Sequence, residues 1–252
     1  MDWFPFRRPG AAGGVVTVPD PKMVSFYSQF IRPGDLVFDV GANVGNRTAI
    51  FLELGARVVA VEPQKACAKI LERCFGRNKA FVLEKLALGA TAGTDYLYQG
   101  SVNTLSSMSE NWIDTVCHSG RFKAYSWDRR RRVKVTTLDN LIHCYGMPYF
   151  VKIDVEGYEL EVIRGLSRPP NMLSMEFAPE ILNPTFEAIR LLSDKGSASF
   201  NYGLGEATSL ELETWVGQEQ IMERLSSYRD RIDVFGDVYV RFDHAKERGN
   251  SS

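Results

Sequence analysis

The order in which apolar and amphipathic segments alternate limits the folds open to this chain. Strand-length apolar runs occur at LVFDV (36–40), RVVAV (57–61) and FVLEKLAL (81–88), and segments with helical periodicity separate them. Continuous apolar runs of this length are typical of strands that a parallel sheet buries on both faces. The order β-α-β-α-β therefore predicts an α/β fold with right-handed crossovers.

The pattern resumes after an interruption at residues 94–135. The last strand-like segment, DVYVRF, alternates apolar with polar residues, as a strand near an antiparallel edge does. We therefore predict a mostly parallel sheet with an antiparallel edge strand and helices on both faces. The predicted organisation is a flexible N-terminal arm (1–20), a single domain (21–243) with an insertion (94–135) and a candidate lid (203–230), and a disordered tail (244–252).

Composition places the chain among ordinary globular proteins. It has 252 residues, of which 44% are hydrophobic and 24% charged, and a formal net charge of −1. That charge gives no global reason to expect a nucleic-acid partner, and no apolar run is long enough for an integral membrane segment. The N-terminus lacks the apolar core of a signal peptide, and the four cysteines are too scattered for a disulfide framework, so we expect a cytoplasmic protein.

The turn after the first predicted strand is rich in glycine and preceded by an acid. It reads D-x-G-x-N-x-G, from Asp39 through Gly41 and Asn43 to Gly45, whereas the dinucleotide fingerprint G-x-G-x-x-G needs glycine where this chain has Asn43 and Asn46. A pyrophosphate favours bare N–H groups. S-adenosylmethionine instead carries an ammonium and a sulfonium, both of which a carboxylate attracts. Asn43 is a residue type that tolerates positive φ. The turn therefore favours S-adenosylmethionine over a dinucleotide.

A second acid, Glu62, ends the second predicted strand. A carboxylate at this place can accept hydrogen bonds from both hydroxyls of an adenosine ribose. It would serve NAD equally, so it supports an adenosine ligand without choosing the cofactor. The alternative is that Asp39 and Glu62 only cap loops at the end of the sheet.

The stretch VKIDVEGYELEVIRGL (151–166) places three charged residues, Lys152, Asp154 and Glu156, where a buried strand emerges from the sheet. Glu176 ends the next strand. Ligands of open α/β sheets bind beyond the carboxyl ends of the strands, so we expect these acids at one rim. Three carboxylates there could bind Mg²⁺, but nothing in their spacing requires it, and we predict no metal site.

Three segments, DVGANVGNRT, TTLDNLI and VKIDVEGYELEVIRGL, resemble the FkbM-type family of S-adenosylmethionine-dependent methyltransferases. The resemblance spans roughly residues 33–180. It implies a class I Rossmann-like methyltransferase fold with a seven-stranded sheet, and methyl transfer to a hydroxyl of a sugar, glycolipid or polyketide-like natural product. Carried over by position, the residues that it implies bind S-adenosylmethionine are Asp39, Gly41, Ala42, Asn43, Gly45, Glu62, Pro63, Leu88 and Asp154.

The resemblance also places Lys152, Asp154 and Glu156 at the methyl-transfer site. A hydroxyl needs help to lose its proton, so our candidates for the base are Asp154 and Glu156, with Lys152 orienting one of them. Alternatively, Lys152 pairs with a carboxylate for structural reasons and Asp154 only touches the cofactor. The arginine run at 129–132 could hold a phosphorylated acceptor, although its alternation with valines favours a solvated strand face.

Two rival functions remain open from the sequence. One is an NAD-dependent sugar-modifying oxidoreductase, which the absence of the G-x-G-x-x-G fingerprint disfavours. The other is a non-catalytic protein that keeps the cofactor pocket. Methylation of nitrogen instead of oxygen also stays open. The acceptor, the position methylated and the oligomeric state are not predicted.

Overall fold

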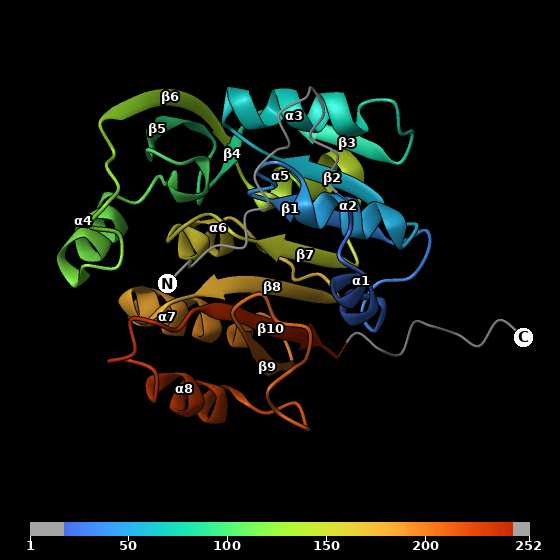
Figure 1. The fold of residues 1–252 in the computed structure, drawn as a ribbon. Helices are drawn as coiled ribbons and strands as arrows, with labels where there is room; N and C mark the ends of the chain where they lie inside the picture. Colours follow the sequence, from blue (N-terminus) through green and yellow to red (C-terminus); the bar gives the residue numbers. More distant parts are fainter. Residues whose placement is uncertain (1–17, 244–252) are drawn as a thin grey trace, which may run out of the picture.

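The computed structural model describes residues 18–243, and its central element is a seven-stranded sheet (Figure 1). In sheet order the strands are β3 (Phe81–Glu84), β2 (Arg57–Val61), β1 (Leu36–Val40), β7 (Phe150–Ile153), β8 (Met172–Phe177), β10 (Gly236–Phe242) and β9 (Ala198–Leu204). Strand β10 runs antiparallel to both β8 and β9, and the other pairings are parallel. The order reverses between β1 and β7, and ligands of open α/β sheets bind beyond the carboxyl ends of the strands at such a point.

Helices cover both faces of this sheet. One face is packed by α1 (Pro21–Ser28), α2 (Asn46–Glu53) and α3 (Lys65–Phe75), and the other by α5 (Leu138–Tyr145), α6 (Glu159–Arg164) and α7 (Leu182–Asp194). The predicted α/β fold, with a mostly parallel seven-stranded sheet and helices on both faces, is therefore confirmed. None of the four cysteines forms a disulfide. No helix between residues 18 and 243 combines the length and the apolar character that crossing a membrane requires.

The interruption predicted at residues 94–135 contributes most of a second, three-stranded sheet, which lies near the carboxyl ends of β7 and β8 in Figure 1. Its strands are β4 (Ala87–Leu88), β6 (Arg129–Thr136) and β5 (Gly93–Gln99), in that order. Between β5 and β6 come a 3-10 turn, η1 (Asn103–Leu105), and α4 (Glu110–Ser119). Trp112 and Val116 of α4 pack against Ala178 and Ile181, which follow β8, so the insertion is anchored on the main domain.

Two sequence predictions need correction. The antiparallel strand is β10, which lies second from the edge, between β8 and β9, and buries residues on both faces. The predicted lid at 203–230 contains α8 (Gln218–Ser226), whose Ile221 and Leu225 are fully buried in the main core. Helix α8 is therefore a structural element, which leaves only the loop of residues 205–217 as a candidate lid. Most of the predicted arm and the whole predicted tail lie outside the described residues.

Candidate functional site

The glycine-rich turn between β1 and α2 has the backbone that its sequence predicts. Asn43 has a φ of 49°, and Gly41 and Gly45 have φ values of 80° and 95°. A Cβ on Gly41 would lie 1.8 Å from the carbonyl oxygen of Asp154, so glycine is needed here because the loop after β7 passes directly against the turn. The requirement for glycine at this position is thus one of packing between the turn and the loop after β7. A Cβ on Gly45 would similarly collide with Phe75 of α3.

Asp39, the penultimate residue of β1, is a buried carboxylate that faces the start of α2. Its side chain is 2% exposed, and Oδ2 accepts a hydrogen bond from the hydroxyl of Thr48. Burial raises the pKa of Asp39 to about 6, and the Thr48 hydroxyl and the nearby Lys152 ammonium limit the rise. The buried Asp39 carboxylate is poorly solvated, so an additional hydrogen-bond donor or a cation would stabilise its ionised form.

Glu62 follows β2 and joins the glycine-rich turn to the next loop. Its Oε2 accepts the backbone N–H of Asn43 at 2.8 Å, and its Oε1 accepts the backbone N–H of Gln64 at 2.7 Å. Burial raises the pKa of Glu62 to about 7 despite these two bonds. Each carboxylate oxygen keeps a second lone pair, so the group can still accept the two hydroxyl donors of a ribose.

The insertion reaches this part of the site, which sequence reasoning missed. The side-chain amide of Asn103 in η1 donates to Asn43 Oδ1 at 2.6 Å, and Gln64 donates from Nε2 to the carbonyl of Asn103 at 2.9 Å. The hydroxyl of Ser106 donates to Gln64 Oε1 at 2.9 Å. These bonds tie η1 to both loops that carry the predicted cofactor residues. A polar residue in an irregular insertion gives no sequence signal that would identify such a partner.

The family resemblance implied three further cofactor residues, Ala42, Pro63 and Leu88. Ala42 is buried and packs with Ala60 and Leu71. Leu88 in β4 is also buried, in the main core, and Pro63 is half-buried directly after Glu62. Ala42 and Leu88 thus have packing roles, and any contact they make with a cofactor stays a prediction.

Lys152 lies beside Asp39 in the sheet, because the two residues are partners in the register of β1 and β7. It is 2% exposed, and its Nζ lies 2.9 Å from Asp237 Oδ1 and 3.2 Å from Asp154 Oδ2. Burial opposes its charge, but Asp154 and Asp237 outweigh burial and raise the pKa of Lys152 well above its ordinary value. Lys152 therefore lies within hydrogen-bond distance of both carboxylates, and its role in orienting one of the two acids stays a prediction. Asp237, at the start of β10, was not predicted.

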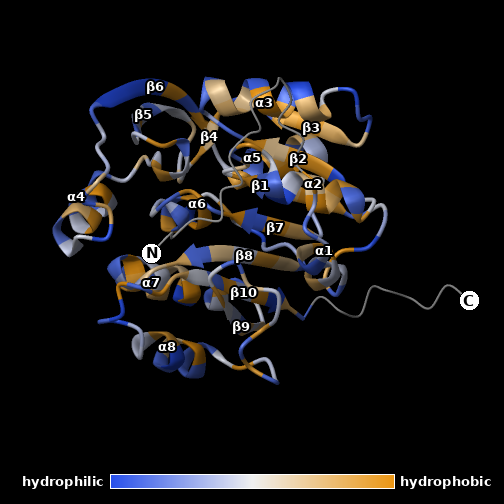
Figure 2. Cartoon of the chain, in the orientation of Figure 1, coloured by the Kyte–Doolittle hydropathy of each residue, from blue (hydrophilic) through white to orange (hydrophobic). Residues whose placement is uncertain are grey.

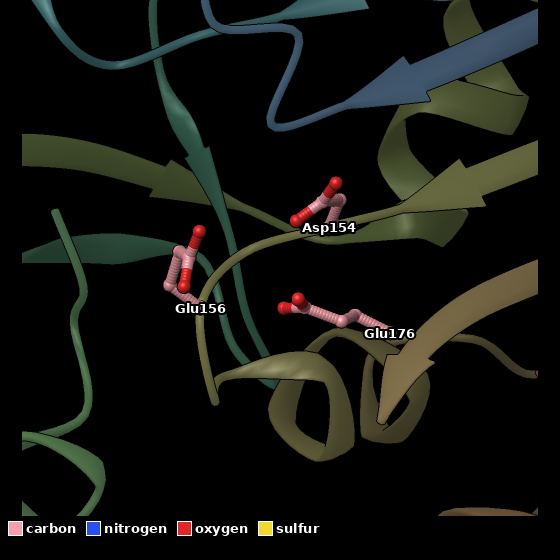
Figure 3. Close-up of side chains that lie close together, drawn as sticks. All are labelled: Asp154, Glu156 and Glu176. Carbon is pink, nitrogen blue, oxygen red and sulfur yellow. The ribbon is translucent and has the colours of Figure 1, made fainter. Parts of the chain in front are cut away.

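Asp154, Glu156 and Glu176 come together beyond the ends of β7 and β8. One carboxylate oxygen from each lies within 4.8 Å of the others, and Figure 3 shows the three groups facing a common space. Glu156 has a φ of 56°, and the loop that carries it is held by Glu159, whose Oε1 accepts the N–H groups of Val155 and Gly157. The sequence predicted this meeting of acids at one rim. Glu159, which shapes the loop, was not predicted.

The electrostatics of this acidic cluster differ from one carboxylate to the next. Burial, followed by the charge of Asp154, raises the pKa of Glu156 well above its ordinary value. Burial, followed by the charge of Glu156, does the same for Glu176. The Asp154 side chain is 40% exposed and has the Lys152 ammonium as a partner. Glu156 and Glu176 therefore retain protons to higher pH than an ordinary carboxyl group.

The same three oxygens could hold a divalent cation, because carboxylates are the ligands that Mg²⁺ and Ca²⁺ prefer. The Lys152 ammonium already supplies positive charge to Asp154. The sequence prediction of no metal site stays a prediction.

Comparison with known proteins gives one family match. Residues 39–202, more than half of the chain, match the family described as "Methyltransferase FkbM domain". No curated protein matches the sequence. Among solved structures, the O-methyltransferase from Bacillus cereus in complex with SAH is 12% identical, with a TM-score of 0.45 and coverage of 90% of this chain and 84% of that one. Precorrin-6y C5,15-methyltransferase from Geobacter metallireducens GS-15 is also 12% identical, with a TM-score of 0.42 and coverage of 87% of each chain.

Proposed function

Because the chain belongs to the FkbM methyltransferase family and is therefore an S-adenosylmethionine-dependent methyltransferase, we propose that it methylates a hydroxyl oxygen of a sugar, glycolipid or polyketide-like natural product. The observation that carries the proposal is the acidic cluster of Asp154, Glu156 and Glu176, which lies beyond the strand ends next to the glycine-rich turn. A group that removes a proton is what a hydroxyl acceptor requires.

The residues of the β1 and β2 loops fit S-adenosylmethionine. Asp39 and Glu62 are buried carboxylates whose pKa values burial raises to about 6 and about 7, so both gain from the hydrogen-bond donors and positive charge of this cofactor. The turn from Gly41 to Gly45 would lie under its methionine portion, and Glu62 would accept its ribose hydroxyls. The cofactor supplies a methyl carbon that its sulfonium already activates, so the enzyme must align the acceptor, exclude water and take up a proton.

Glu156 is the better proton acceptor of the two candidates. The Asp154 carboxylate already accepts a hydrogen bond from the Lys152 ammonium at 3.2 Å, which occupies its Oδ2. Within residues 18–243 Glu156 forms no ion pair, and burial raises its pKa. We therefore assign Glu156 to take the hydroxyl proton, and Asp154, positioned by Lys152, to orient the acceptor or the cofactor.

An amine acceptor is the second candidate, because three clustered carboxylates would also attract an ammonium group. The acceptor would then be methylated at nitrogen after losing its proton to the same cluster.

The test is transfer of an isotopically labelled methyl group from S-adenosylmethionine to a panel of sugars, glycolipids, polyketide alcohols and amines. We expect a labelled methyl ether from the alcohols, and Glu156→Gln should lower kcat by roughly 10²–10⁴-fold. Glu187→Gln, an exposed change of the same kind on α7, should leave the rate unchanged. A labelled product only from amines would contradict oxygen methylation, and full activity in Glu156→Gln would contradict its role as base.

A further inference from the structure

The small sheet carries a strongly positive outer face. Strand β6 presents Arg130, Arg132 and Lys134 on one side, and all three are exposed. Opposite them in the register of β5 lie Tyr98, for Arg130, and Tyr96, for Arg132. Figure 2 shows most of β6 as hydrophilic, on the margin of the molecule. We call Arg130, Arg132 and Lys134 the basic face.

These cations have no acidic partner among the described residues. None of the ion pairs formed between residues 18 and 243 involves the basic face. The Arg130 guanidinium lies 4.7 Å from the centre of the Tyr96 ring, and Arg132 donates to the hydroxyl of Thr94 at 2.9 Å, so both side chains are held outward by neutral groups. In a chain with a net charge of −1, this is a locally positive surface whose cations form no ion pair within residues 18–243.

The basic face is also extended and open. Alternate residues of a strand are about 6.7 Å apart, so the three cations span roughly 13 Å. Strand β4 pairs only with residues 135 and 136 of β6, so within the described chain the backbone of residues 129–134 has no strand on the side away from β5. Arg129 and Arg131, on the opposite side of the same strand, add positive charge next to the face. The surface therefore suits a broad anionic partner.

The aromatic residues of the sheet argue against single-stranded nucleic acid as that partner. Such ligands are bound by stacking bases on free aromatic rings. Here the Tyr96 ring is covered by Arg130, and the Tyr98 hydroxyl is hydrogen bonded to Glu110. Binding to an anionic bilayer requires only accessible cations, and tyrosine side chains are enriched at the level of lipid headgroups.

We propose that the basic face docks the enzyme on an anionic phospholipid bilayer. The insertion that carries this face also contacts the acidic cluster, because the Ser107 hydroxyl donates to the carbonyl of Glu156 at 2.6 Å. Docking through the small sheet would therefore hold the acceptor side of the site close to the lipid surface. The docking itself does not depend on the proposed methyl transfer and is measured without any acceptor.

The experiment is co-sedimentation of the full chain with vesicles of phosphatidylcholine alone, or of phosphatidylcholine mixed with phosphatidylglycerol. We expect binding only to the anionic vesicles. Each cation near an anionic surface contributes about fivefold in partitioning, so Arg130→Gln, Arg132→Gln and Lys134→Gln together should weaken binding on the order of a hundredfold. Raising the salt from about 0.1 to about 1 M, which shortens the screening length from about 10 to about 3 Å, should release the wild type.

A matched triple variant separates the basic face from overall charge. Lys69→Gln, Arg77→Gln and Lys79→Gln remove the same charge at exposed positions on and after α3 and should change binding only slightly. Equal losses in the two triple variants, with unchanged circular dichroism, would refute a specific face. Absence of vesicle binding by the wild type would also refute the proposal, and the cations would then serve only to keep an open strand edge from pairing. Retention of a single-stranded oligonucleotide without vesicle binding would assign the face to nucleic acid instead.

Discussion

Replacing Lys152 tests how the core supports the site. Its Nζ lies 2.9 Å from Asp237 Oδ1 and 3.2 Å from Asp154 Oδ2, and Lys152 and Asp237 are 2% and 7% exposed. Removing one partner of a buried ion pair typically costs about 3–5 kcal/mol, because the other charge is left buried. We therefore expect Lys152→Met to lower the free energy of unfolding by about 3–5 kcal/mol, which corresponds to a fall in Tm of roughly 6–20 °C for a chain of this size.

The double variant Lys152→Met/Asp237→Leu should behave differently in stability and in activity. An apolar pair of similar volume can replace a buried ion pair at little cost, so stability should return to within about 1 kcal/mol of the wild type. Methyl transfer should stay impaired, because Asp154 has still lost the ammonium that orients it. Urea unfolding measures the first quantity, and labelled methyl transfer measures the second. Arg231→Met, in an exposed pair with Asp233, serves as the control and should cost less than about 1 kcal/mol.

Two results would refute this reasoning. If Lys152→Met unfolds within about 1 kcal/mol of the wild type, the pair with Asp237 does not carry the energy of a buried ion pair. If the double variant recovers activity together with stability, Lys152 serves only the core and does not position Asp154.

Four further predictions follow from the site. Gly41→Ala should destabilise the fold by about 3 kcal/mol or more, measured by urea unfolding, because its Cβ would meet the Asp154 carbonyl at 1.8 Å and φ is positive. Asn103→Ala should weaken S-adenosylhomocysteine binding by roughly 5–10-fold in calorimetry, because the turn loses one hydrogen bond. If Glu156 is the base, kcat/KM should rise with pH well above the ordinary carboxyl range, and a kcat/KM that does not change over that range would contradict this role. Burial raises the pKa of Glu62 from 4.5 to about 7, so between these pH values the folded protein holds a proton that the unfolded chain has released. About 3 kcal/mol of the free energy of unfolding, present below pH 4.5, should therefore be lost as the pH rises through 7. Glu62→Gln should remove this pH dependence.

The local chemistry of the site was accessible from the sequence. The positive φ of Asn43 followed from its place in the middle-glycine position of the turn, and the structure confirms it. The convergence of Asp154, Glu156 and Glu176 followed from a general property of parallel sheets, whose carboxyl strand ends share one edge. In both cases a few neighbouring residues and the direction of the strand were sufficient to predict the local geometry.

What the sequence missed depends on contacts between distant segments. Asp237 is 85 residues from Lys152, and its role follows from the position of β10 next to β8, which alternation in DVYVRF does not reveal. The same alternation suggested an edge strand, but Tyr239 and Asp237 are buried under α1 and α2 instead of facing solvent. Asn103 belongs to an irregular insertion whose path over the turn is set by tertiary packing. No local periodicity encodes such partners.

The most direct test of the central claim is calorimetric titration of the protein with S-adenosylhomocysteine and, separately, with NAD. We expect saturable binding of one S-adenosylhomocysteine per chain, no binding of NAD, and a loss of affinity in Glu62→Ala. Glu211→Ala, an exposed carboxylate in the loop after β9, is the control and should bind like the wild type. Binding of NAD, or of neither ligand by the folded wild type, would contradict the assignment of the turn at Asp39 to Gly45 and the methyl-transfer function that rests on it.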